Sequence, residues 1–192
     1  MCIRDSIWDE WADENGSIGK AYGYQLGVRH QYKEGMMDQV DRVLYDLKNN
    51  PYSRRIMTNI YVHQDLHEMN LYPCAYSMTF NVTGNKLNAI LNQRSNDILT
   101  ANNWNVVQYA VLVHMIAQVS GLEAGELVHV IADAHIYDRH IPLVKELIKR
   151  QTYDAPVFRM NPDVKDFYEF TVDDFELEDY KYGPQIKIPV AV

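Results

Sequence analysis

A cysteine and an arginine stand at the two ends of a predicted β-hairpin. Cys74 opens a stretch of alternating apolar and polar residues, Arg94 closes the next one, and the turn sequence "TGN" at 83–85 lies about halfway between them. Because the strands of a hairpin are antiparallel, its open ends meet, and we expect Cys74 and Arg94 to lie side by side. The guanidinium would then favour a thiolate or hold an anion next to it. A buried thiol and a surface arginine are the simpler interpretation of each residue alone.

Other polar residues are of the types that recognise a nucleotide. The adjacent Arg54 and Arg55 follow a proline turn, where they could grip a phosphate or form part of a solvated turn. His135 and Tyr137 share one face of a predicted strand, so their polar tips could bond a sugar hydroxyl or be satisfied at the strand end. Asn105 heads a long apolar helix. Its amide offers the donor and the acceptor that the edge of a uracil ring requires, but an asparagine there is often only the helix N-cap.

The helices expected to position these residues follow from apolar spacing. A helix over 36–49 is amphipathic and ends at "NNP". The segment 106–119 is apolar almost all round, which predicts a helix buried on every side and ended by Gly121. A second amphipathic helix is expected over 138–151, with Pro142 in its first turn.

The strands are predicted from alternation and from branched and aromatic residues. They are expected at 56–62, 74–82, 86–94 and 126–137, with short strands in the tail. The strand at 126–137 is apolar enough to be buried on both faces. Strands and helices together define the α+β class, with a mixed or largely antiparallel β-sheet packed with helices.

The composition is that of an ordinary globular chain with an acidic balance. Its 192 residues can bury one core, and the formal net charge of −8 argues against DNA or RNA as a general partner. No apolar run is long enough to span a membrane, and no cysteine pattern predicts a metal. We expect one domain in a reducing cytoplasm. The opening "MCIRDS" fits nothing that follows, so we expect an artefactual or foreign start at 1–6 and give Cys2 no role.

Several short motifs occur in a specific order and spacing. They are "IWDEWADENG", "NNPYSRRI", "YPC", "QRSND" before Asn105, "HIY" and a final "PVAV". In these motifs the chain resembles the thymidylate synthase family over 7–192. The resemblance implies a single thymidylate synthase-like domain with a mixed β-sheet, which forms a homodimer through the sheet. Family members begin upstream of "IWDEW", with a segment that carries a phosphate-binding arginine and a catalytic glutamate, so we expect this chain by itself to be weak or inactive.

The resemblance also implies a reaction, the reductive methylation of dUMP to dTMP by 5,10-methylenetetrahydrofolate, which leaves as dihydrofolate. Folate is a co-substrate that supplies both the methylene and the hydride, and no metal takes part. The thiolate of Cys74 would add to carbon 6 of the uracil, and Tyr22 would assist proton removal from carbon 5. The implied catalytic residues are Cys74, Arg94, Tyr22 and Asn105.

Binding residues are implied by the same resemblance, with the site shared across the homodimer. Arg54 and Arg55 would reach the phosphate in the partner subunit's site. The residues implied to bind dUMP are Arg54, Arg55, Arg94, Ser95, Asn105, His135 and Tyr137. The residues implied to bind folate are Trp8, Trp11, Leu71, Asp97 and Val192.

Departures from the family pattern keep other functions open. Ala75 stands where the family usually has a histidine, and residues 101–104 replace its usual Gly-Leu-Pro-Phe. One alternative is a folate-dependent hydroxymethylase of dUMP or dCMP, in which water rather than hydride ends the reaction. In that case Asn105 favours uracil over cytosine. A non-catalytic nucleotide-binding relative is the other alternative, and the retention of Cys74 favours the enzyme.

Overall fold

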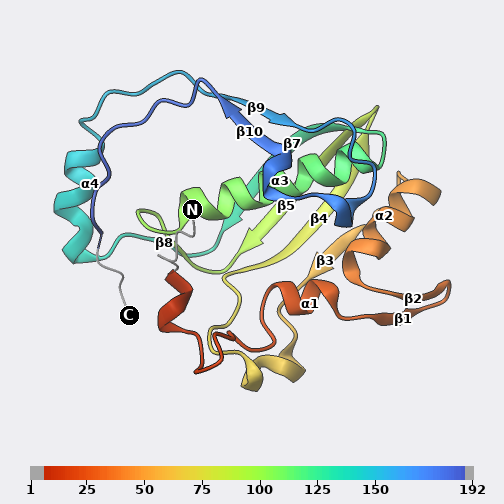
Figure 1. Cartoon of the computed structure of the whole chain (residues 1–192). Helices are drawn as coiled ribbons and strands as arrows, with labels where there is room; N and C mark the ends of the chain where they lie inside the picture. Colours follow the sequence, from red (N-terminus) through yellow and green to blue (C-terminus); the bar gives the residue numbers. More distant parts are fainter. Residues whose placement is uncertain (1–6, 189–192) are drawn as a thin grey trace.

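The computed structural model describes residues 7–188, and its largest sheet is mixed. Its strands lie side by side in the order β3 (Met57–Asn59), β4 (Ala75–Thr83), β5 (Lys86–Gln93) and β7 (Glu123–Ile131) (Figure 1). The pairs β3–β4 and β4–β5 are antiparallel, whereas β5 and β7 are parallel. The expected α+β class with a mixed sheet is confirmed.

Shorter elements surround this sheet. The helices are α1 (Gly23–Gly27), α2 (Gln39–Asn49), α3 (Asn102–Val119) and α4 (Ile141–Leu147), and 3-10 helices cover Ile7–Glu10, His63–Glu68, Asp138–His140, Phe167–Glu169 and Val172–Asp174. Two-stranded sheets pair β1 (His30–Tyr32) with β2 (Gly35–Met37), β6 (Asn96–Asp97) with β8 (Ala134–His135), and β9 (Val157–Met160) with β10 (Phe175–Glu178). The β9–β10 pair accounts for the short strands expected in the tail.

Several predicted bounds change in the structure. The helix expected at 36–49 is confirmed as α2, which starts after Asp38 because that carboxylate accepts a hydrogen bond from the Asp41 amide at 2.8 Å. The helix expected at 138–151 begins as a 3-10 turn and ends at Leu147, with Pro142 in the first turn of α4 as expected. The strand expected at 126–137 is divided between β7 and β8, which belong to different sheets.

The hairpin of β4 and β5 places one set of side chains in the core. Met78 and Phe80 of β4 and Leu87 and Leu91 of β5 are buried, as the alternation predicts. The two-residue turn begins at Gly84, whose φ of +62° suits the first position of a type II′ turn. This short turn sets the register of the two strands, and the register decides which residues meet at their open ends.

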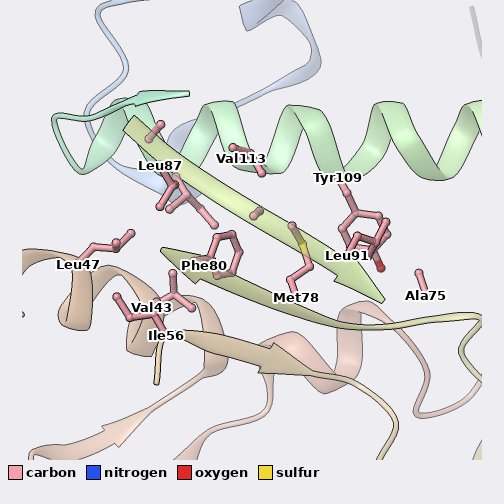
Figure 2. Close-up of a cluster of buried hydrophobic side chains, with 13 residues drawn as sticks. Val43, Leu47, Ile56, Ala75, Met78, Phe80, Leu87, Leu91, Tyr109 and Val113 are labelled. Atoms are coloured by element: carbon pink, nitrogen blue, oxygen red, sulfur yellow. The ribbon is translucent and has the colours of Figure 1, made fainter. Parts of the chain in front are cut away.

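Helix α3 packs across the inner face of the sheet, and the core forms between them (Figure 2). Tyr109, Val113 and Ile116 of α3 are buried in it. The prediction that residues 106–119 are buried on every side is wrong, because Val107 is 59% exposed and His114 is exposed as well. Residues three and four apart form a single stripe, and only that stripe contacts the sheet.

The prediction that the strand following α3 is buried on both faces is also wrong. Val128 and Val130 of β7 are 48% and 47% exposed, since within residues 7–188 only the opposite face of the sheet is covered by α3. Register places Met57 next to Thr79, Thr79 next to Ile90, and Ile90 next to Val128. The exposed apolar side chains of Met57, Ile90 and Val128 therefore lie in one row across the sheet, with Thr79 between the first two. None of the helices in this part of the chain combines the length and apolarity that crossing a bilayer demands.

Gly121 ends α3 as predicted, and its replacement tests the stability of this end. Its φ is +69°, its amide donates to the carbonyl of Gln118, and the amide of Leu122 donates back to Ala117 at 2.8 Å. We expect Gly121→Ala to lower the free energy of unfolding by about 1–2 kcal/mol, because a Cβ disfavours this left-handed conformation. Urea unfolding measures the loss. Gly27→Ala is the matched control, since Gly27 has open space and no positive φ; equal losses in both variants would contradict the explanation.

Candidate active site

The open end of the β4–β5 hairpin brings Cys74 and Arg94 together. The amide of Arg94 donates to the carbonyl of Cys74 at 2.9 Å, and an Nη2 atom of Arg94 lies 3.9 Å from the Cys74 sulfur. The prediction that the two residues lie side by side is therefore confirmed. A β-bulge between Ala75 and Ser77 shifts the register by one residue, and this shift sets Arg94 opposite Cys74.

The Arg94 guanidinium is fixed by the loop that precedes the cysteine. Its Nε donates to the carbonyl of Pro73 at 3.1 Å, and Nη2 donates to the carbonyl of Tyr72 at 2.9 Å. The planar fork of donors thus holds the chain on the N-terminal side of the thiol. Its Nη1 has no hydrogen-bond acceptor among residues 7–188.

Tyr22 contacts the same loop from another part of the chain. The amide of Cys74 donates to the Tyr22 hydroxyl at 3.1 Å, and the ring of Trp8 meets the Tyr22 ring edge to face, with centroids 5.2 Å apart. Burial, and next the charge of Cys74, raise the pKa of Tyr22, so its hydroxyl stays protonated at neutral pH. Its backbone has a φ of +39°, which is uncommon for a residue with a side chain.

Replacement of Tyr22 tests its support of the cysteine loop. We expect Tyr22→Phe to lower the free energy of unfolding by about 1–3 kcal/mol, because the amide of Cys74 loses its acceptor in a part-buried place. The measurement is urea unfolding of the variant beside Tyr24→Phe, the control, because Tyr24 is 46% exposed. A Tyr22→Phe protein as stable as the Tyr24→Phe protein would show that the hydroxyl contributes nothing here.

Tyr109 also lies close to the thiol, and sequence reasoning missed it. It is 8% exposed on the inner side of α3. Burial, with a smaller effect from the charge of Cys74, raises the pKa of Tyr109 to about 12. Its spacing of one helical turn from Asn105 is the signal that could have found it, because residues four apart share one face of a helix.

Asn105 is not the N-cap of the long helix. Helix α3 begins at Asn102 and its N-cap position is Ala101, so the capping interpretation is wrong. The Asn105 amide nitrogen instead donates to the carbonyl of Ala101 at 3.0 Å, and its oxygen accepts from Gln93 at 2.7 Å. Asn105 therefore belongs to a side-chain network that also involves the last residue of β5.

The strands β6 and β8 continue the site beyond Arg94. Register places Asp97 directly beside His135. The Asp97 carboxylate accepts from the amide of Leu99 at 3.1 Å and from the hydroxyl of Thr100 at 2.5 Å, so it shapes the turn that leads into α3. The rings of His135 and Tyr137 pack edge to face at 5.2 Å, and a nitrogen of His135 lies 3.2 Å from an Asp133 oxygen. Ser95 precedes β6, and its carbonyl accepts from Gln93.

Arg54 and Arg55 do not join this site within one chain. Both are exposed in the turn before β3, and neither side chain bonds to another residue of the described part of the chain. The amide of Phe80 donates to the carbonyl of Ile56, so the arginines lie near the hairpin-turn end of β4. Phe80 and Cys74 are separated by six residues of extended chain, which is about 20 Å.

The structure brings some of the residues implied to bind folate close to the loop that precedes Cys74. Trp8 packs on Tyr22. The Asn70 side chain donates to the carbonyl of Trp11 at 2.8 Å, which brings Leu71, the next residue, to the same loop region. Val192 lies outside the described residues. Between residues 7 and 188, no cluster of three or more histidine, cysteine or acidic side chains is arranged to hold a metal ion.

A mixed sheet that carries a thiol, a fixed guanidinium and a tyrosine hydroxyl at one strand end is the arrangement of an enzyme with a cysteine nucleophile. The family model described as thymidylate synthase matches residues 3–192. Thymidylate synthases of Bacillus licheniformis and Bacillus phage phi3T are 49% and 48% identical to this chain over 187 residues. That alignment covers 97% of this chain and 67% of each relative.

A solved structure agrees with these relatives. The thermostable thymidylate synthase A from Bacillus subtilis matches with a TM-score of 0.92 at 46% identity, over 97% of this chain and 68% of that one. The chain belongs to the thymidylate synthase family, whose members are methyltransferases. It spans about two thirds of the length of these relatives.

Proposed function

We propose that the function of this chain is the reductive methylation of dUMP to dTMP, with 5,10-methylenetetrahydrofolate as the one-carbon donor, and that the chain by itself performs it slowly. The observation that carries the proposal is the pair formed by the Cys74 thiol and the Arg94 guanidinium, 3.9 Å apart at the open end of the hairpin. A partly accessible thiol next to a fixed cation is typical of a nucleophile rather than of a core residue.

The bond changes balance without any further reductant. The Cys74 thiolate bonds to carbon 6 of the uracil, and the displaced electron pair makes carbon 5 a nucleophile that attacks the folate methylene, whose bond to one folate nitrogen breaks. The proton on carbon 5 then passes to water, and Tyr22, whose hydroxyl stays protonated, orients this acceptor by hydrogen bonding. The bond from the methylene to the second folate nitrogen breaks next, which leaves tetrahydrofolate and a methylene group on carbon 5. A hydride from the tetrahydrofolate adds to this methylene as the thiolate leaves carbon 6, and the products are dTMP and dihydrofolate.

The binding of dUMP uses residues at the same end of the sheet. In this proposal Arg94 and Ser95 hold the phosphate, and His135 and Tyr137 bond the deoxyribose hydroxyl. The pairing of β6 with β8 supports the grouping, because it sets the strand after Ser95 beside the strand that carries His135. Asn105 reads the edge of the uracil ring with one donor and one acceptor.

We further propose a homodimer through the outer face of the sheet. The exposed apolar row of Met57, Ile90 and Val128 supports this surface, because burial of such side chains favours association. Arg54 and Arg55 are too far from Cys74 in their own chain and would reach the phosphate in the partner's site. Residues 7–192 would form one domain. The cytoplasm is the proposed compartment, since Cys74 has to stay reduced.

The folate is proposed to bind as a co-substrate against the loops around Cys74. Trp8, Trp11 and Leu71 supply an apolar wall for its rings, and Asp97 would bond the pterin. The packing of Trp8 on a tyrosine that contacts the cysteine loop supports this wall. The tail ending at Val192 would close over the ligands and exclude water.

A single-turnover reaction tests the function. The chain, in excess over dUMP labelled with tritium at carbon 5, is incubated with 5,10-methylenetetrahydrofolate, and the products are separated. We expect release of tritium, with dTMP and dihydrofolate formed in equal amounts. A hydroxymethyl product without dihydrofolate would identify a hydroxymethylase instead. Binding of dUMP without release of tritium would identify a non-catalytic nucleotide-binding protein.

A further inference from the structure

A chain of hydrogen bonds runs from His129 on β7 through Gln93 on β5 to Asn105 on α3, the residue proposed to read the base. The Nε2 atom of His129, on β7, lies 2.8 Å from the Oε1 atom of Gln93 at the end of β5. The Nε2 atom of Gln93 donates to Asn105 Oδ1 at 2.7 Å and to the carbonyl of Ser95 at 2.8 Å. Gln93 is only 2% exposed, so the Gln93 side of each bond is shielded from bulk water, whereas His129 is partly exposed.

Two backbone carbonyls reveal the direction of every bond in this chain. The carbonyl of Ser95 can only accept, so the atom of Gln93 that faces it has to be the amide nitrogen. The carbonyl of Ala101 likewise requires that the amide nitrogen of Asn105 face it, at 3.0 Å. A flip of either amide would place two acceptors against each other in a low-dielectric place. The carbonyls therefore identify the orientation of both amides, and each amide is held in it by one backbone bond together with its neighbour in the chain of bonds.

The same argument assigns the proton of His129. Since the Gln93 oxygen faces the imidazole, the Nε2 atom of His129 has to carry a hydrogen and donate it. Burial lowers the pKa of His129, which favours the neutral ring at neutral pH. The neutral ring with its hydrogen on Nε2 satisfies the Gln93 oxygen, which would otherwise be a buried acceptor without a partner.

We propose that His129 is a positioning residue that fixes, through Gln93, the orientation of the Asn105 amide and thereby the choice between a 4-oxo and a 4-amino pyrimidine. The inference rests on the proposed function in one respect, namely that Asn105 reads the base. The oxygen and the nitrogen of Asn105 each keep one free position after the internal bonds are made. A flip would exchange donor and acceptor, which is the difference between the edges of uracil and cytosine.

Replacement of His129 by two side chains separates the donor from the shape of the ring. His129→Phe keeps a flat ring but removes the donor, whereas His129→Gln keeps an amide N–H at similar reach. We expect the preference for dUMP over dCMP in equilibrium binding to fall about tenfold in His129→Phe, by the loss of one buried hydrogen bond. His129→Gln should restore the preference. His114→Phe is the matched control, because His114 packs against Phe158 at 5.0 Å and takes no part in the chain of bonds.

A spectroscopic measurement tests the hydrogen bonds of His129, Gln93 and Asn105 without any ligand. Nitrogen-15 NMR of the imidazoles in the whole chain should show His129 with its hydrogen on Nε2, and the Gln93 side-chain amide should shift in His129→Phe but not in His114→Phe. A hydrogen on Nδ1 of neutral His129 would overturn the assignment. An unchanged dUMP preference in His129→Phe would overturn the positioning role while leaving the proposed function intact. Failure of the unmodified chain to bind either nucleotide would instead overturn the proposed function, and this inference with it.

Discussion

Cys74→Ser is expected to abolish covalent capture of 5-fluoro-dUMP. The normal reaction removes a proton from carbon 5, but the fluorine of this analogue cannot be removed as a cation in its place. With 5,10-methylenetetrahydrofolate present, the adduct on the nucleophile therefore persists. A serine hydroxyl remains protonated near neutral pH and is a far weaker nucleophile than a thiolate, so we expect adduct formation to slow by about a thousandfold or more. Intact mass of the protein after incubation measures the adduct.

The chain supplies a matched control for this experiment. Cys2→Ser removes the other cysteine and should leave capture unchanged, since Cys2 is given no role. Because serine is nearly the same size as cysteine, urea unfolding of Cys74→Ser should stay close to that of the unmodified chain. Capture by Cys74→Ser at the original rate would show that another residue is the nucleophile and would demote Cys74 to a structural thiol.

Arg94→Lys should slow adduct formation by about a hundredfold and also lower stability, although the charge is kept. The guanidinium makes separate bonds to the carbonyls of Pro73 and Tyr72 while it lies against the thiol. One ammonium group cannot reach these three places at once, because it is a point charge on a flexible stem. Hydrogen bonds to charged groups contribute about 1.5–3 kcal/mol each, so the loop before Cys74 should loosen.

The rate of capture and the free energy of unfolding are measured together for this variant. Arg159→Lys is the control, because Arg159 is exposed and pairs with Glu178 on β9 and β10, away from the hairpin end. We expect its rate and its stability to stay near the original values. If Arg94→Lys captured the analogue as fast as Arg159→Lys, a positive charge near the thiol would be sufficient, and the fixed fork would have no part in activating it.

Local patterns were enough to predict the hairpin and the pairing of its ends. The alternation along β4 and β5 and the turn at Gly84 are properties of neighbouring residues, so they predict which side chains face the core and that Cys74 and Arg94 meet. The left-handed end of α3 at Gly121 is equally local. The family follows from short motifs in order, because their residue types and spacing are visible without any structure.

Burial was predicted less well, because it depends on what lies on each side of an element. The apolar composition of α3 and β7 indicated burial all round, yet Trp104, Val107 and Val128 are exposed where no element within 7–188 covers them. Composition reports how apolar a surface is, and only the packing of layers reports which surface is covered.

The sequence by itself determined which residue types could react or bind, their order along the chain and the hairpin that joins Cys74 to Arg94. These features depend on local spacing. Only the tertiary structure decided the one-residue bulge that gives the exact register of the two strands at this end, and the network of His129, Gln93 and Asn105. The members of that network come from β7, β5 and α3, and their contacts depend on strand register and helix packing between segments far apart in the sequence. No local pattern encodes such contacts, since they arise when distant segments bury a common face.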